Sequence, residues 1–157
     1  MSPTVYIEST IPSYLTAWPS RDLVRAAHQQ LTREWWEQRR GDYELFISQF
    51  VVDEAAGGDA QAATERLLML EDIPLLDSTP EVEDPAKEIT QRVKLPPRAE
   101  KDASHIAMAA WHGMDFLLTW NCTHINNQQL LPRIEQACRQ AGCSCPVICT
   151  PDELLQL

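Results

Sequence analysis

The amino-acid sequence predicts a single α/β domain in which helices cover both faces of a mostly parallel central β-sheet. Short apolar segments with the composition of β-strands alternate with segments whose apolar residues recur every three or four positions. This alternation is typical of parallel strands joined by helices, and it favours a three-layer α/β/α arrangement. The chain has 157 residues, enough for one hydrophobic core, and contains no internal repeat or linker that would divide it. We therefore expect residues 1–157 to form one domain.

Strands are expected where short apolar runs are rich in β-branched and aromatic residues. Five segments fit this description: residues 4–7, 43–48, 75–76, 116–120 and 147–149. In an open parallel sheet, the functional crevice lies outside the carboxyl ends of the strands. The polar residues that directly follow each strand are therefore the first candidates for a functional site.

Helices are expected between these strands because apolar residues recur there at helical spacing. In the first helix, apolar residues from Leu23 to Trp35 recur every four positions after a candidate N-cap at Ser20. Gly142 is expected to end a later helix, and Thr150 to cap the last one. Beyond the first helix, the helical segments are residues 50–55, 60–70, 82–93, 101–111, 130–141 and 152–155.

Composition restricts the class of protein. Hydrophobic residues make up 44% of the chain and charged residues 23%, as in ordinary globular domains. No apolar run approaches the roughly 20 residues that span a bilayer. The N-terminus lacks the basic and apolar regions of a signal peptide. We therefore expect a cytoplasmic protein without a membrane segment.

The net charge of −10 argues against extended binding of nucleic acid through phosphate contacts, for which proteins are usually basic. It is compatible with an enzyme whose acidic cluster binds a divalent metal ion. It also suits a protein that is held by a basic segment of a partner.

Five cysteines are present, and four of them lie near the C-terminus, at positions 138, 143, 145 and 149. An odd number crowded at one end does not fit a secreted disulfide framework. The spacing does not match the C-x2-C pairs of zinc sites either. We expect reduced thiols in and beside a buried strand, with a structural zinc site as the alternative.

Four polar positions fall where the sheet would bring them to one edge. They follow strands or lie in the first turns of helices, and they are Glu8, Glu54, Asp102 and Asn121. Hydroxyl groups accompany them at Thr10, Ser48 and Thr119. A cluster of carboxylates is costly without a compensating cation, because like charges repel. Oxygen ligands suit Mg²⁺ or Mn²⁺, and a pair of such ions can activate water for phosphodiester hydrolysis. The sequence therefore predicts an Mg²⁺ or Mn²⁺ site at this edge.

Five stretches, taken in order, also resemble a known family. They read YIESTIPSYL from residue 6, SQFVVDE from residue 48, DASHIAMA from residue 102, LTWNCTHI from residue 118 and PVICTPDELL from residue 146. Together they resemble the PIN domain, and more narrowly the VapC-like toxin ribonucleases of bacterial toxin–antitoxin modules. Each stretch is short, but the ordered set touches nearly the whole chain.

The resemblance implies a PIN-like fold and a metal-dependent endoribonuclease, a hydrolase that cleaves RNA and leaves a 5′-phosphate. It also implies a homodimer and, where the gene belongs to a toxin–antitoxin module, a cognate antitoxin protein as partner. Glu54 and Asp102 match the second and third acidic positions of the family. Glu8 stands where most members have Asp, and Asn121 stands where most have the fourth acid. Thr119 matches the hydroxyl residue two positions before it.

Some of these residues have a structural interpretation as well. Asp102 is favoured in the first turn of a helix by the helix dipole, and Asn121 is a common type of turn residue after a strand. Asp53 and Asp59 compete with Glu54 for its place in the site, because the two valines before them leave the phase of the helix open.

Residues beside these positions allow two interpretations each. His105 either borders the cleft or makes a hydrogen bond within the core or to a site residue, and we favour the hydrogen bond. His124 is a candidate for substrate contact. Arg98 and Lys101 either steer RNA phosphates or belong to a solvated turn.

The five tryptophans are many for a chain of this length. Trp35 follows the apolar stripe of its helix and is expected in the core, whereas Trp18 and Trp36 are expected at an interface. Trp120 stands next to the predicted site, where stacking on an RNA base is one option.

Two other functions remain open. The replacements at Glu8 and Asn121 also suit a non-catalytic PIN-fold protein with a weakened metal site, acting through protein or RNA binding. A receiver-like signalling domain would need an Asp at the end of a middle strand and a Lys after the last strand. This chain has Ser48 at the first of these positions and no suitable Lys after Asn121.

Overall fold

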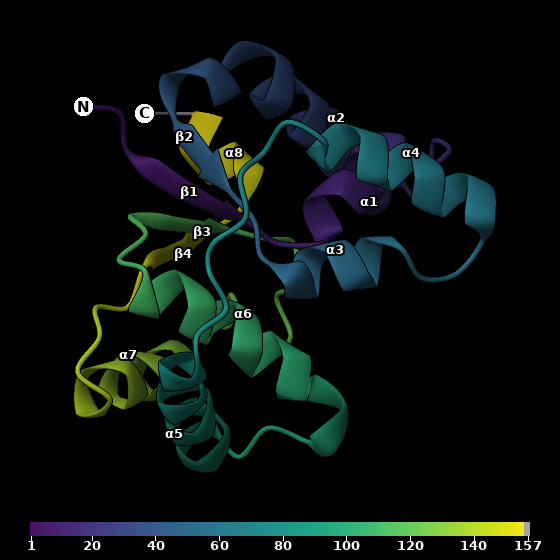
Figure 1. Cartoon of the computed structure of the whole chain (residues 1–157). Helices are drawn as coiled ribbons and strands as arrows, with labels where there is room; N and C mark the ends of the chain where they lie inside the picture. The colour runs from purple at the N-terminus through teal and green to yellow at the C-terminus, as the bar shows by residue number, and fades with distance from the viewer. Residues whose placement is uncertain (156–157) are drawn as a thin grey trace.

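The computed structural model describes residues 1–155 and has a four-stranded sheet at its centre (Figure 1). The strands are β1 (Thr4–Ile7), β2 (Glu44–Phe46), β3 (Phe116–Leu118) and β4 (Val147–Cys149). Their order is β2-β1-β3-β4, and every neighbouring pair is parallel. The expected α/β class with a mostly parallel sheet is therefore confirmed.

Two of the strands are shorter than the sequence predicts, and one predicted strand is a single bridge. The predicted strand 75–76 only forms a parallel bridge between Ile47 and Leu75. The Ile47 amide donates to the Pro74 carbonyl oxygen at 3.1 Å, and the Leu76 amide donates to the Ile47 carbonyl oxygen at 2.8 Å. The chain therefore leaves the regular sheet soon after β2 and β3, and the residues beyond these strands are available for the site.

Helices cover both faces of the sheet and produce the three layers that the sequence predicts (Figure 1). One layer contains α1 (Thr10–Thr16), α2 (Leu23–Gln38), α4 (Ala60–Leu70) and α8 (Pro151–Leu155). The other contains α5 (Glu83–Val93), α6 (Glu100–Trp111) and α7 (Leu131–Gln140). The remaining helix, α3 (Gln49–Ala55), contacts both α4 and α6 and so links the two layers. Three short 3₁₀ turns are η1 (Arg40–Asp42), η2 (Pro80–Val82) and η3 (Pro97–Ala99).

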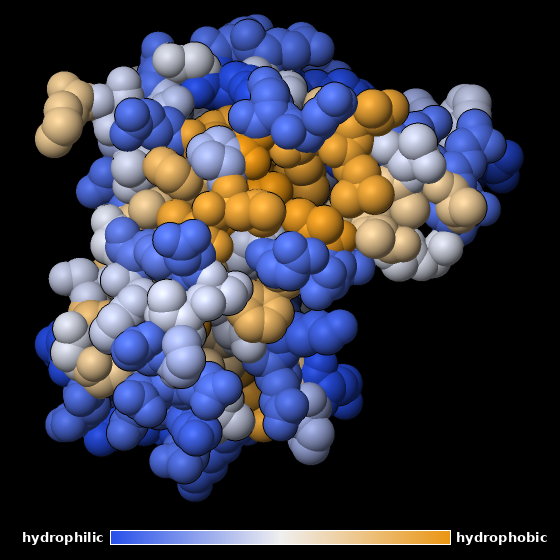
Figure 2. Space-filling model, viewed as in Figure 1, coloured by the Kyte–Doolittle hydropathy of each residue, from blue (hydrophilic) through white to orange (hydrophobic). Residues whose placement is uncertain are grey.

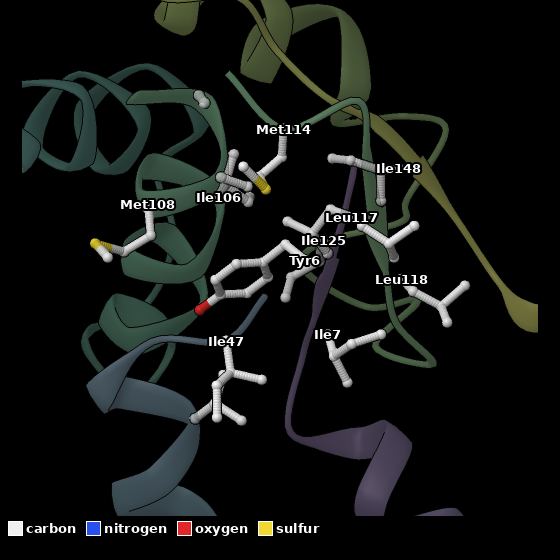
Figure 3. Close-up of a cluster of buried hydrophobic side chains, with 14 of the residues drawn as sticks. Tyr6, Ile7, Ile47, Ile106, Met108, Met114, Leu117, Leu118, Ile125 and Ile148 are labelled. Carbon is white, nitrogen blue, oxygen red and sulfur yellow. The ribbon is translucent and has the colours of Figure 1, made fainter. Parts of the chain in front are cut away.

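The central strand β1 is buried on both faces, because helices pack against each side of it. Val5, Tyr6 and Ile7 are all fully buried, as expected for a parallel strand that reads as a continuous apolar run. Figure 3 shows the ring of Tyr6 directed toward α6, and Ile7 directed away from it. Trp35 of α2 is also fully buried, as the sequence predicts. The buried apolar residues form one hydrophobic cluster.

The ends of two helices test the capping predictions. The predicted cap Ser20 is wrong for α2, because Asp22 occupies the N-cap and its carboxylate accepts the Arg25 amide at 2.9 Å. Ser20 instead accepts the Asp22 amide through its hydroxyl group at 3.1 Å. Gly142 follows the end of α7 with φ of 80°, a left-handed conformation that suits glycine, so that prediction is confirmed.

None of the helices in the described part of the chain combines the length and the apolar character needed to cross a membrane.

Candidate functional site

The candidate site lies at the carboxyl ends of β1 and β3. From β1 the chain crosses to β2 on one side, whereas β3 pairs with β1 on the other side. Ligands of open α/β sheets bind at such a point of reversal. Ile7 pairs with Leu118, so the next residues of the two strands, Glu8 and Thr119, are neighbours. These are two of the positions predicted from the sequence.

Glu8 is a buried carboxylate held entirely by hydroxyl and amide donors. It is 2% exposed. Its Oε1 atom accepts the Thr10 amide at 3.2 Å, the Thr10 hydroxyl at 2.6 Å and the Thr119 hydroxyl at 2.6 Å. Its Oε2 atom accepts the Ser9 hydroxyl at 2.9 Å. These four bonds offset the cost of burying the charge, and they give Thr10 and Thr119 the supporting place that the sequence predicts.

Glu54 approaches Glu8 from α3, and the Ser9 hydroxyl lies between the two carboxylates. The Ser9 Oγ atom is 3.2 Å from Glu54 Oε1 and 2.9 Å from Glu8 Oε2. The same Oε1 atom of Glu54 is hydrogen-bonded to Nε2 of His105. The fold thus brings Glu8 and Glu54 to the same place. Ser9, which contacts both, is 45 positions away from Glu54 in the chain.

The two competitors of Glu54 lie elsewhere. Asp53 is exposed on the outer side of α3, where its carboxylate accepts the Gln49 side-chain amide at 2.9 Å. Asp59 is the N-cap of α4 and accepts the Ala62 amide at 3.0 Å. Of these three acids, the structure therefore directs only Glu54 toward Glu8.

A buried chain of hydrogen bonds leads from Ser48 to Glu54. The Ser48 hydroxyl is 2.7 Å from the Tyr6 hydroxyl, which is 2.7 Å from Nδ1 of the fully buried His105. A carboxylate only accepts hydrogen bonds, so Nε2 of His105 must donate to Glu54. With a neutral imidazole, Nδ1 then accepts from Tyr6, and Tyr6 accepts from Ser48. Ser48 consequently supports the site through two other residues rather than by touching an acid.

Tyr6 and Ser9 were not among the predicted site residues. Tyr6 lies two positions before Glu8, which directly follows β1, so the strand alternation directs both side chains to the same side of the sheet. A tyrosine in a buried strand nevertheless has the sequence pattern of an ordinary core residue. Burial raises the pKa of Tyr6 far above its ordinary value, and the negative charges of Glu8 and Glu54 add to this effect. The Tyr6 hydroxyl therefore keeps its proton. The hydrogen bond expected for His105 is present.

Asp102 and Asn121 form a second pair next to these carboxylates. Asp102 accepts a hydrogen bond from the Asn121 side chain, and its Oδ2 atom is 3.1 Å from Nδ1 of His124. The Asn121 side-chain oxygen accepts the amides of Thr123 and His124 at 3.3 and 3.1 Å. The backbone amide of Asn121 donates to the Thr119 hydroxyl at 2.9 Å. Asn121 is thus both the turn residue and a neighbour of Asp102, and its oxygen is occupied by backbone donors.

The two half-buried acids of the site have opposite pKa shifts. For Asp102, burial raises the pKa, and the hydrogen bond from Asn121 and the positive charge of His124 offset this only in part. For Glu54, burial also acts to raise the pKa, but the bond from His105, the Ser9 hydroxyl and the charge of Lys101 hold it below its ordinary value. Carboxyl groups whose pKa values are driven apart are common where one must stay charged and another must exchange a proton.

Glu8, Glu54 and His105 are the described side chains placed closely enough to share a metal ion. One potential ligand atom of each lies within 4.8 Å of those of the other two. Two carboxylates and an imidazole suit a divalent ion such as Mn²⁺, but both ring nitrogens of His105 are already hydrogen-bonded, to Tyr6 and to Glu54. Asp102 stands outside this group of three, although the charge of Glu8 raises its pKa. The predicted set and the geometric set therefore share Glu8 and Glu54.

Of the tryptophans considered in the sequence, Trp36 differs from its prediction. Trp36 is wrong as an interface residue, because it is only 8% exposed and the Arg40 guanidinium covers its ring at 4.2 Å. Trp18 is 91% exposed. Trp120 stacks on His28 with 4.0 Å between ring centroids, and its indole nitrogen donates to a threonine hydroxyl of α2.

Comparisons with known proteins leave the family open. No protein-family model matches the chain, and no curated protein is found as a relative. The resemblance to the PIN domain remains an expectation from the sequence.

Proposed function

We propose that this protein is an Mg²⁺- or Mn²⁺-dependent endoribonuclease of the PIN type. The observation that supports this most strongly is the gathering of Glu8, Glu54, Asp102 and Asn121 at one edge of the sheet. Their segments are far apart in the chain, and the buried Glu8 has no described cationic partner among its hydrogen-bond donors. A binding site for a divalent cation explains why acids are concentrated at this edge.

Glu8, Glu54 and Asp102 would hold the metal, which when bound lowers the pKa of water and stabilises charge on a phosphate group. The hydroxyls of Ser9, Thr10 and Thr119 fix the Glu8 carboxylate.

Two further side chains, His105 and Asn121, act directly on the carboxylates. His105 holds its Nε2 proton toward Glu54 and keeps that carboxylate charged. Asn121 acts as a donor that orients Asp102, rather than as an oxygen ligand.

RNA is the proposed substrate, bound over a short stretch rather than an extended surface, because the net charge is −10. Lys101 is exposed beside the site, and its charge reaches Glu54. Arg98 is exposed in the preceding turn. These two cations are the proposed contacts for RNA phosphates, and the proposed activity places the protein in the cytoplasm.

The cleavage test uses two site variants and a neighbouring acid as control. Asp102→Ala and Glu54→Ala are expected to abolish cleavage of single-stranded RNA in Mn²⁺ while the protein stays folded by circular dichroism. Asp53→Ala changes an exposed acid on the same helix as Glu54, so it is expected to leave cleavage unchanged. Normal activity of either site variant would assign that residue a structural role and remove it from the site.

A non-catalytic PIN-fold protein is the second candidate, and one specific observation favours it. The Glu8 carboxylate already accepts four hydrogen bonds, and the Asn121 oxygen accepts two backbone amides. Fewer oxygen atoms are then free for metal ligation. Calorimetric titration with Mn²⁺ separates the candidates, because the enzyme requires binding that Glu54→Ala weakens, whereas absence of binding favours the second candidate.

We also propose two protein partners. A second copy of the chain would cover the apolar surface that Figure 2 shows where Figure 1 draws β2 and α4. Leu68 and Leu75 are 61% and 51% exposed in this part of the chain, and Leu68→Glu with Leu75→Glu should reduce a dimer to a monomer in sedimentation. The other partner is an antitoxin whose arginine pairs with the site carboxylates. Co-expression with the neighbouring gene should recover it as a complex, and repeated isolation of the chain alone would argue against it.

A further inference from the structure

The end of α7 folds back on itself and brings three cysteines together. After Ala141, Gly142 adopts a φ of 80°. The Gly142 amide donates to the Arg139 carbonyl oxygen at 3.1 Å, and the Cys143 amide donates to the Cys138 carbonyl oxygen at 2.9 Å. This pair of bonds is a Schellman motif, which reverses the chain at the end of a helix. The segment that leads to β4 therefore runs back beside Cys138.

The reversal brings the thiol of Cys145 close enough to that of Cys138 for each to shift the pKa of the other. Cys138 is fully buried in α7, whereas Cys145 is half-buried. A surface cavity of about 430 Å³ opens at Cys145, and its wall includes Cys143, Arg139 and Glu135. A small solute can therefore reach Cys145 through this cavity. Cys138 is not part of the cavity wall and lies on the buried side of Cys145.

The pKa values of the two thiols are shifted in opposite directions. The hydrogen bond from Cys138 lowers the pKa of Cys145, and the charge of Arg139 helps, against the opposing effects of burial and Glu135. The hydrogen bond with Cys145 and burial raise the pKa of Cys138. Cys145 is thus the thiol of the pair that loses its proton more readily, and thiolates rather than thiols react with peroxides.

We propose that Cys138 and Cys145 form a peroxide-reactive dithiol that is oxidised to a Cys138–Cys145 disulfide. The Cys145 sulfur attacks one oxygen of hydrogen peroxide, the O–O bond breaks, and hydroxide leaves to take a proton from solvent. The resulting sulfenic acid on Cys145 is attacked by the sulfur of Cys138. The S–S bond forms as the S–O bond breaks, and the Cys138 proton leaves with the hydroxyl group as water. Two thiols are oxidised and one peroxide is reduced to two waters.

This site is separate from the carboxylate cluster. Cys145 precedes β4, so it lies at the amino ends of the parallel strands, whereas the cluster lies at their carboxyl ends. The proposal therefore does not depend on the ribonuclease activity, and its test does not use that activity.

The other cysteines provide internal references. Cys122 is exposed, but partial burial of its thiol and the charges of Glu153 and Asp152 raise its pKa. Burial raises the pKa of Cys149 to about 12. If exposure alone decided reactivity, Cys122 would be the first thiol to react with peroxide. The proposed chemistry predicts that Cys145 reacts first.

The experiment treats the full chain with hydrogen peroxide, alkylates the remaining thiols, and maps them by mass spectrometry. The expected product is a peptide pair joined through Cys138 and Cys145, with Cys122 alkylated. Cys138→Ser should stop disulfide formation and leave a sulfenic acid on Cys145 that dimedone traps. Cys143→Ser is the matched control and should still form the disulfide. Without any variant, limited iodoacetamide at neutral pH should label Cys145 before Cys122.

Three results would overturn the proposal. The first is oxidation or alkylation of Cys122 ahead of Cys145 in the unaltered chain. The second is a disulfide that involves Cys143 in place of Cys138 or Cys145. The third is five thiols that all survive a peroxide treatment sufficient to oxidise free cysteine.

Discussion

Thr119→Val removes one hydroxyl group from the centre of the candidate site and leaves the shape of the side chain almost unchanged. Thr119 is fully buried. Its hydroxyl donates to the Glu8 carboxylate at 2.6 Å and accepts the Asn121 amide at 2.9 Å. Valine fills the same volume, so a cavity does not contribute to the result. The variant therefore isolates the hydrogen bonds that hold Glu8.

The magnitude follows from these two bonds. A hydrogen bond to a charged group contributes about 1.5–3 kcal/mol, and the half-buried backbone amide of Asn121 left without an acceptor costs about 1 kcal/mol. We expect Thr119→Val to lower the free energy of unfolding by about 3 kcal/mol. Thr119→Ser keeps the hydroxyl and loses one buried methyl group, which costs about 1 kcal/mol.

Urea unfolding followed by tryptophan fluorescence, in the presence of EDTA, measures the difference between the two variants. A second pair in a Glu8→Gln background tests the charge: the neutral acceptor should halve only the contribution of the bond to residue 8, so the cost of Thr119→Val should fall from about 3 to about 2 kcal/mol. Equal stability of Thr119→Val and Thr119→Ser would refute the account of Glu8. So would an unchanged cost in the Glu8→Gln background, because the charge of the carboxylate would then add nothing to the bond.

Three further predictions concern other parts of the chain. Asn121→Asp should lower the Mn²⁺ concentration needed for half-maximal binding and reduce stability in EDTA, because it adds a charge and replaces a donor to Asp102; identical metal titrations of both proteins would place Asn121 outside the site. The folded-state pKa of Glu54 is below its ordinary value, so its contribution is present above the unfolded pKa and is lost as the pH falls through the folded pKa. Glu54→Gln should therefore flatten the loss of stability below about pH 5 in urea unfolding, and parallel acid profiles would contradict this. Gly142→Ala should lower stability by about 1 kcal/mol through its positive φ alone, since no atom lies within 4 Å of the added methyl group; Gly41→Ala, which is equally open and has no positive φ, should be close to neutral.

The fold class follows from periodicity, and its details depend on geometry that periodicity does not contain. Alternating strand and helix patterns predict a parallel sheet, and the sheet is parallel. Leu75 and Leu76 look like a short strand because they are apolar, but only one bridge forms beside Ile47. Ser20 and Asp22 are both good N-cap residues, and only the backbone path decides that Asp22 caps α2.

The candidate site was predictable where strand ends fix the positions. Glu8 and Thr119 follow paired strands, so their contact could be expected. The choice of Glu54 over Asp53 required the phase of α3, which two adjacent valines obscure. The bonds from Tyr6 to His105 and Ser48 join a core strand, a helix and a loop, and sequence spacing gives no measure of such contacts. Trp36 was wrong because a ring covered by Arg40 has the same sequence pattern as an exposed one.

The most direct test of the central claim is cleavage of one end-labelled single-stranded RNA by the same sample with and without divalent metal. Cleavage should occur in Mn²⁺ or Mg²⁺, stop when EDTA is added, and resume when the metal is restored in excess. The products should carry 5′-phosphates. Cleavage that continues undiminished in EDTA would contradict a metal-dependent mechanism, and absence of cleavage by a protein that binds Mn²⁺ would contradict the assignment as a ribonuclease.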